Sequence, residues 1–124
     1  MKNILSSLII MCFCLSGHAQ NFQKTSHGIK TVTNGNTVEI QFYSPSIVRV
    51  IKFPAGKSYS KESLSVVLSP SQTTFTAKED NKFILLKSDK LSITINPSSG
   101  DITFGSASGK QLLKEKPEGT KFVP

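Results

Sequence analysis

The sequence has no tryptophan, only two cysteines and only two histidines among its 124 residues. Both cysteines, Cys12 and Cys14, lie in an N-terminal segment that we expect to be removed, so the mature chain is expected to carry no thiol. This excludes a disulfide staple, a cysteine nucleophile and a zinc site built on thiolates. The length allows one small domain and excludes a large multidomain enzyme, so stability must come from a single apolar core.

Groups for acid–base or metal chemistry are also scarce. His27 is the only histidine after residue 19, and no nucleophile motif surrounds any serine, which argues against a zinc site and a Ser-His-Asp set. No glycine-rich stretch introduces a helix, as a phosphate-binding loop requires. The acidic residues fall mainly in expected turns or on polar strand faces, where turn geometry alone favours Asp80, Asp89 and Asp101. We therefore predict no catalytic, cofactor-binding or metal-binding residue in this chain.

Residues 1–19 have the three parts of a secretory signal peptide. Lys2 supplies the positive charge, an apolar stretch follows over residues 4–15, and the small residues Gly17 and Ala19 occupy the −3 and −1 positions. The apolar stretch is shorter than the roughly 20 residues that span a bilayer, so no transmembrane segment is expected.

We predict cleavage near Ala19 and export of residues 20–124, as one domain, to the periplasm or the cell exterior. A lipid anchor on Cys14 is the alternative. The Met-Cys-Phe sequence at 11–13 does not match the Leu and small residues that usually precede a lipidated cysteine.

The formal net charge is +7, but the positive charges are dispersed. Arg49 is the only arginine, and the lysines occur singly apart from a loose group after residue 109. Nucleic-acid surfaces favour clustered Arg and Lys with interleaved aromatic residues or a recognisable motif. The pattern indicates a solvated face, and no nucleic-acid partner is expected.

After the N-terminal segment, no window has apolar residues at helical spacing, whereas alternation typical of strands is frequent. Asn34-Gly35 between two such runs is a strong hairpin signal, because both turn positions tolerate a positive φ. Consecutive runs separated by turn residues predict a meander of antiparallel strands, and seven or eight short strands without a helix predict an all-β antiparallel β-sandwich. The expected strands are 28–33, 37–43, 47–53, 82–87, 91–95, 102–104 and 112–113, with 64–68 and 73–77 as further candidates.

The run at 47–53 is apolar on both faces, which predicts a central strand covered on both sides. Arg49 is expected on the more buried face, in a structural ion pair or reaching the strand's edge, with a ligand role as the lesser alternative. Most phenylalanines occupy strand positions and are expected in the core. Tyr59, in the loop predicted over 54–63, is the one candidate for an exposed, sugar-stacking platform and hence for substrate binding.

Several strand motifs together resemble the opening of secreted bacterial glycoside hydrolase family 31 enzymes, the α-glucosidases and α-xylosidases. The similarity runs in order from about Phe22 to Pro124. Its motifs are Phe-Gln-Lys-Thr at 22–25 with Gly-Ile at 28–29, Ile-Val-Arg-Val at 47–50, Ser-Leu-Ser-Val-Val at 63–67, Leu-Ser-Ile-Thr-Ile at 91–95, Gly-Asp-Ile-Thr-Phe at 100–104 and Gly-Lys-Gln-Leu-Leu-Lys-Glu at 109–115.

The resemblance implies an N-terminal β-sandwich related to the galactose mutarotase fold, packed on a (β/α)8 barrel. In the family, that barrel supplies an aspartate nucleophile and an aspartate general acid for retaining hydrolysis of α-linked glycosides. Neither catalytic motif occurs here, so no catalytic residue carries over. The family enzymes are several times longer, which implies a truncated sandwich with an unpaired strand edge, inactive alone, and a barrel downstream in the full-length protein.

The leading hypothesis is therefore a non-catalytic N-terminal domain of an exported α-glycosidase that acts in carbohydrate degradation. The alternative is a standalone exported β-sandwich that binds an oligosaccharide or a protein partner. A purely structural module of the cell envelope is the third hypothesis.

Overall fold

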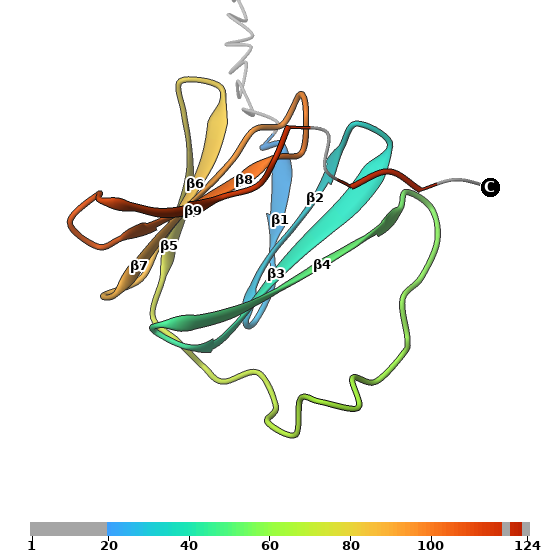
Figure 1. Ribbon diagram of the computed structural model, residues 1–124, viewed down its shortest axis with the longest axis horizontal. Coiled ribbons are helices and arrows are strands. Elements are labelled where there is room, and N and C mark those ends of the chain that lie inside the picture. The colour runs from blue at the N-terminus through green and yellow to red at the C-terminus, as the bar shows by residue number, and fades with distance from the viewer. Residues whose placement is uncertain (1–19, 118–119, 123–124) are drawn as a thin grey trace, which may run out of the picture.

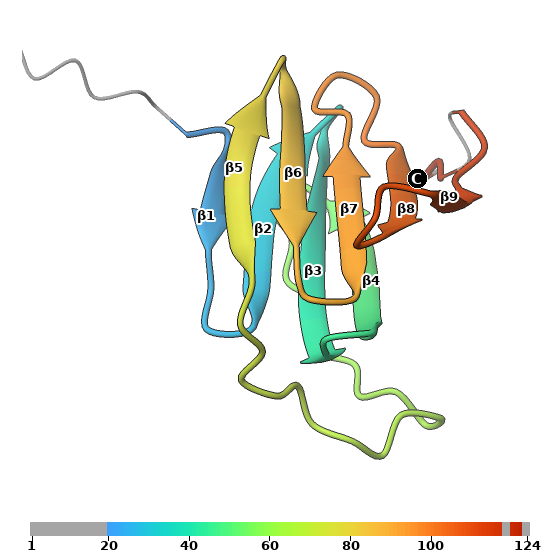
Figure 2. The ribbon, with the colours of Figure 1, turned by 90° about the vertical axis from the view of Figure 1, so that its left-hand side faces the viewer.

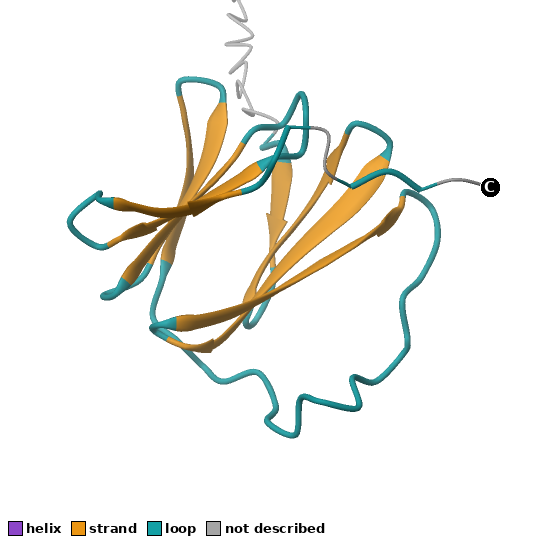
Figure 3. Cartoon of the chain, in the orientation of Figure 1, coloured by secondary structure: helices purple, strands orange, loops and turns teal. Residues whose placement is uncertain are grey.

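A computed structural model describes residues 20–117 and 120–122, and the predicted signal peptide and its cleavage site at Ala19 lie outside them. The described residues form two antiparallel sheets and no helix, with strand orders β1-β2-β3-β4 and β5-β6-β7-β8-β9. The sheets lie face to face as the two layers of a β-sandwich (Figures 1 and 3). The strands are β1 (Phe22–Lys24), β2 (Gly28–Thr33), β3 (Asn36–Ser44), β4 (Ile47–Pro54), β5 (Thr76–Asp80), β6 (Phe83–Lys87), β7 (Leu91–Ile95), β8 (Ile102–Ser106) and β9 (Gln111–Lys114).

The chain forms each sheet as a meander because tight turns join successive strands. Between β2 and β3, Asn34 and Gly35 both adopt a positive φ, of 48° and 74°, which confirms the predicted hairpin. A second two-residue turn joins β5 to β6 through Asn81 and Lys82, also both at positive φ. Lys82 is therefore a turn residue, and the strand predicted over 82–87 begins one residue later.

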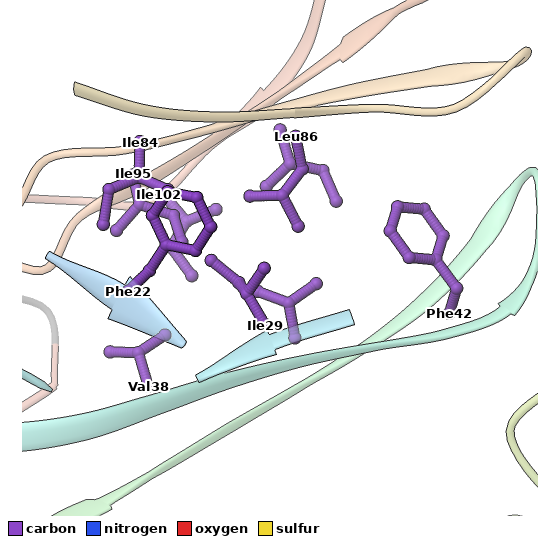
Figure 4. Close-up of a cluster of buried hydrophobic side chains, with 10 residues drawn as sticks. Phe22, Ile29, Val38, Phe42, Ile84, Leu86, Ile95 and Ile102 are labelled. Atoms are coloured by element: carbon purple, nitrogen blue, oxygen red, sulfur yellow. The ribbon is translucent and has the colours of Figure 1, made fainter. Parts of the chain in front are cut away.

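The core consists of the alternate side chains that point from each sheet toward the other (Figure 4). Ile29 lies opposite Ile40 across β2 and β3, and Ile84 lies opposite Ile95 across β6 and β7. Each fully buried aliphatic side chain stabilises the fold by roughly 1.5–3 kcal/mol relative to exposure. The cluster is Phe22, Ile29, Val38, Ile40, Phe42, Ile84, Leu86, Ile93, Ile95 and Ile102.

Residues 55–75 form a long loop that leads from the first sheet to the second (Figure 1). The backbone N–H of Ser71 donates to the carbonyl oxygen of Phe42 at 3.1 Å, and the Phe75 ring stacks on Phe42 with centroids 5.1 Å apart. The prediction of a strand over 64–68 was wrong, because that segment pairs with no strand in the described part of the chain. The strand expected at 73–77 lies instead at β5, three residues later.

β4 is an outer strand of the first sheet, so the prediction that residues 47–53 form a central strand was wrong. Its core-facing residues are Val48 and Val50, which lie opposite Phe42 and Ile40 of β3. Arg49 therefore points to the outer face of the sheet, not to the buried side. The apolar residues of its own face misled the prediction, because the outer face of β4 is itself partly covered.

A charged contact links the two sheets beside β4. Lys52 Nζ donates to Glu115 Oε2 at 2.6 Å and to the carbonyl oxygen of Gly100 at 2.9 Å. The same Glu115 oxygen accepts the backbone N–H of Ile102 at 2.9 Å. The pair joins β4 to the segment after β9 and fixes one side of the sandwich.

Candidate functional site

The outer face of the first sheet carries an aromatic pair. The Phe53 ring, on β4, stacks with Tyr59 of the long loop, with centroids 6.3 Å apart and an interplanar angle of 25°. Lys30 Nζ lies 5.7 Å from the Phe53 centroid on the neighbouring part of the same face. Tyr59 remains 45% exposed. Its ring is therefore accessible to solvent on one side and packs on Phe53 on the other.

Arg49 lies beside two phenol groups. A side-chain hydrogen bond with Tyr43 raises the pKa of the Arg49 guanidinium, and Tyr59 adds to the effect, because both phenols favour the charged form. Neither the Lys52–Glu115 nor the Lys78–Asp80 ion pair includes Arg49, which has no carboxylate partner among the described residues. We call Tyr43, Arg49, Phe53 and Tyr59 the tyrosine–arginine cluster.

Next to this cluster, a groove of about 310 Å³ separates the start of β4 from part of the long loop. Its walls are mainly apolar. On the loop side, Val67 is 94% exposed and Leu68 is 68% exposed. The groove is lined by Tyr43, Ile47, Val48, Arg49 and residues 65–68. Arg49 and Tyr43 thus provide polar groups in an otherwise apolar concavity, a composition typical of binding surfaces.

The predicted site residue, Tyr59, is thus brought together with Arg49, whose ligand role was only the lesser alternative. Neither Tyr43 nor the groove-lining residues 65–68 were predicted as site residues from the sequence. The sequence did contain a signal that Arg49 lies near Phe53. The two residues are four positions apart on one strand, so their side chains share a strand face. No comparable signal marked residues 65–68, whose position depends on the path of the loop.

Most of the described carboxylates take part in local or structural contacts. Glu39 accepts a hydrogen bond from Gln41, and Asp101 accepts one from Ser99. Over residues 20–117 and 120–122, no group of three or more His, Cys, Asp or Glu side chains is arranged to hold a metal ion. His27 contacts only its exposed neighbour Ser26 through its ring, at 3.1 Å in the described structure. That the chain holds no catalytic, cofactor or metal residue stays a prediction.

The two antiparallel sheets define the described chain as a β-sandwich domain, as predicted. It is similar to a solved glycoside hydrolase family 31 α-xylosidase from Xanthomonas citri, with 28% identity and a TM-score of 0.74 over 82% of this chain. An α-xylosidase of the same family from a soil metagenome, solved with xylose, is 20% identical with a TM-score of 0.63 over 84% of this chain. The cycloalternan-forming enzyme of Listeria monocytogenes is 17% identical with a TM-score of 0.59 over 77%.

This chain therefore resembles part of the glycoside hydrolase family 31 enzymes, as its strand motifs indicated. It spans only 11%, 16% and 9% of those three solved chains, respectively. No protein-family model and no curated protein matches the sequence. Within the described residues, no helix is long and apolar enough to cross a membrane.

Proposed function

We propose that this chain is a non-catalytic, N-terminal β-sandwich domain of an exported α-glycosidase of the family 31 type. A (β/α)8 barrel elsewhere in a longer polypeptide would carry the catalytic aspartates, and this domain would support it. The observation that carries the proposal is the similarity to the Xanthomonas citri α-xylosidase over most of this chain but a small part of that enzyme. The structural contacts of Glu39, Asp101 and Glu115 support a non-catalytic role.

Two comparisons make an α-xyloside the first substrate to test, because both solved enzymes are named α-xylosidases. The experiment expresses the product of the complete reading frame and, separately, the 124-residue chain. Both are assayed with p-nitrophenyl α-xyloside and p-nitrophenyl α-glucoside. We expect turnover by the longer product and none by the chain alone. Turnover by the chain alone, or a reading frame without a barrel, would overturn the proposal.

Export after removal of residues 1–19 is part of the same proposal. It rests on the sequence of that segment, with Gly17 and Ala19 before the expected cleavage point. N-terminal sequencing of the mature protein should begin at Gln20. A start at a lipid-modified Cys14 would establish the anchored alternative instead.

A carbohydrate-binding module is the second candidate function, and the half-exposed Tyr59 beside Arg49 is the observation that favours it. Calorimetric titration of the chain with xylo- and gluco-oligosaccharides tests this function. If the module binds sugar, Tyr59→Ala should abolish affinity because the stacking ring is lost. Tyr59→Phe is the matched control, since it keeps the ring and should retain binding. Absence of affinity in the unmodified chain would remove this candidate.

A further inference from the structure

The outer face of the second sheet carries a pocket of about 200 Å³. The side chains of Ile84, Ile93 and Ile95 belong to the core, so the residues that alternate with them on β6 and β7 face away from the first sheet. Figure 2 shows β6, β7 and β8 side by side in the second sheet, which lies in front of the first in that view. The pocket and the tyrosine–arginine cluster therefore lie on opposite faces of the sandwich.

The floor of the pocket consists of two rows of polar side chains. Thr94 of β7 lies opposite Thr103 of β8, and Thr103 lies opposite Lys114 of β9. In the second row, the backbone N–H of Asn96 donates to the carbonyl oxygen of Asp101 at 3.0 Å, which continues the pairing of β7 with β8. The rows are two residues apart along the strands, about 7 Å, and neighbouring strands are about 5 Å apart. Five hydrogen-bonding side chains thus share one small area of the sheet.

Two apolar rings line the same pocket. Ile84 lies opposite Ile95 across β6 and β7, so the preceding residue, Phe83, occupies the position opposite Asn96. The Phe83 side chain is 42% exposed. Pro117, in the segment after β9, also lines the pocket. Polar and apolar groups therefore meet in one concavity, as they do in sites for small ligands.

Within the described part of the chain, most hydrogen-bonding groups of the pocket have no protein partner. Asp101 Oδ2 accepts a hydrogen bond from the Ser99 hydroxyl at 2.8 Å, which leaves Asp101 Oδ1 available. Over residues 20–117 and 120–122, the hydroxyls of Thr94 and Thr103 and the ammonium of Lys114 make no hydrogen bond or ion pair. A ligand can therefore bind these groups without breaking a contact of the fold.

The pocket contains one negative and one positive side chain, which form no ion pair with each other in the described structure. Asp101 lies two residues before Thr103, the partner of Lys114, so the two charged residues occupy diagonal positions roughly 7–8 Å apart. An anion would be repelled by Asp101, and a cation would be repelled by Lys114. A neutral ligand that both donates and accepts hydrogen bonds suits both charges.

Sugar hydroxyls have this property, because each provides one O–H donor and two acceptor lone pairs. A pyranose ring also has C–H groups that pack on an aromatic side chain such as Phe83. The pocket volume of about 200 Å³ lies below the roughly 300–1,000 Å³ of sites for drug-sized ligands, which favours a single ring.

We infer that this pocket binds one pyranose ring of a neutral carbohydrate. Asp101 and Lys114 bind hydroxyls from two sides, Thr94 and Thr103 add hydrogen bonds from the floor, and Phe83 packs on the ring. The inference goes beyond the proposed function, because it uses only groups of this chain and requires neither a catalytic barrel nor Tyr59.

A heteronuclear NMR titration of the 124-residue chain, with shifts followed residue by residue, tests this inference. The probes are D-xylose and D-glucose, and glycine and inorganic phosphate represent zwitterionic and anionic ligands. At least one of the sugars should cause saturable shifts of the amides at Thr94, Asn96, Asp101 and Thr103. Glycine and phosphate should leave these amides unchanged.

Two substitutions in the pocket should weaken the binding of sugar without unfolding the chain, because the groups that they remove have no partner among the described residues. Lys114→Met should raise the Kd about 10-fold or more, since a charged hydrogen-bond donor is lost. Thr94→Val keeps the branched shape and should raise the Kd about 2–10-fold. Lys87→Met is the matched control, because Lys87 ends β6 outside the pocket, and it should leave the Kd unchanged.

Tyr59→Ala separates this inference from the second candidate function. Sugar-induced shifts that persist in this variant and weaken in Lys114→Met would support the pocket on the second sheet. Shifts that vanish in Tyr59→Ala and persist in Lys114→Met would assign the sugar to the tyrosine–arginine cluster and overturn the inference. It would also be overturned if neither sugar caused saturable shifts up to about 100 mM, or if glycine or phosphate shifted the pocket amides instead.

Discussion

The contact between Lys52 and Glu115 provides a sharp test of how the two sheets are held together. The side chains are 13% and 29% exposed, and they join residues that are 63 positions apart in sequence. Glu115→Gln keeps the size of the side chain and removes its charge. The Lys52 ammonium then remains largely buried and faces only neutral acceptors, the Gly100 carbonyl oxygen and the oxygen of the new amide.

The expected cost follows from the exposure of the pair. Removing one partner of a fully buried ion pair costs about 3–5 kcal/mol, and water near Glu115 reduces this to about 1–3 kcal/mol. Lys52→Met should cost less, about 0.5–1.5 kcal/mol, because Glu115 keeps the Ile102 N–H and can reach water. The effects should therefore differ between the two partners, with the loss of the carboxylate more destabilising.

Urea denaturation of the chain, followed by far-UV circular dichroism, measures both free energies of unfolding. Asp80→Asn is the matched control, since Asp80 and Lys78 form an exposed pair with side chains 48% and 62% exposed. That variant should lie within about 0.5 kcal/mol of the unmodified chain. The reasoning is refuted if Glu115→Gln also lowers the free energy of unfolding by less than about 0.5 kcal/mol, or if Lys52→Met is the more destabilising change.

Three further changes test the packing, each by denaturant or thermal unfolding of the chain. Gly28→Ala should destabilise the fold by at least about 3 kcal/mol, because its Cβ would lie 1.8 Å from the Ile40 carbonyl oxygen. Gly35→Ala, in open space at φ 74°, should cost only about 1–2 kcal/mol. Equal effects of the two changes would contradict the close approach of Gly28 to the Ile40 backbone. Ile93→Ala should cost about 2–5 kcal/mol because the side chain is fully buried, and a loss below 1 kcal/mol would place it outside the core. Val67→Ser should change stability by less than about 0.5 kcal/mol, since Val67 is 94% exposed, and a larger loss would mean that the loop packs on the sheet.

Local patterns were sufficient to predict much of the fold. The Asn34-Gly35 turn predicts a hairpin, and the alternation in β3 and β7 predicts strands with one apolar and one polar face. Antiparallel sheets with one apolar face pack on each other as a sandwich. The turn through Asn81 and Lys82 was harder to predict, because lysine seldom adopts a positive φ and signals no turn. The segment at 64–68 is rich in strand-forming residues, but propensity cannot supply the neighbouring strand with which it would pair.

The candidate site was only partly predictable for a related reason. Tyr59 is identifiable as a loop aromatic residue from its surroundings in sequence. Its partners, Phe53 and Arg49, lie on a strand whose outer face is as apolar as its inner face, so alternation does not show which side is buried. The groove beside Val67 depends on where a loop of about twenty residues passes, which local sequence does not determine.

We could predict the fold class, the principal hairpins and most of the core from local sequence patterns, because alternation and turn chemistry act between near neighbours. The sequence also carried the resemblance to family 31 enzymes. The three-dimensional arrangement was needed to show that β4 lies at an edge, that Arg49 faces outward beside Tyr43 and Tyr59, and that Leu113 is exposed. Each of these depends on which strands the two sheets contain and how far they overlap, and such long-range pairing has no local signature.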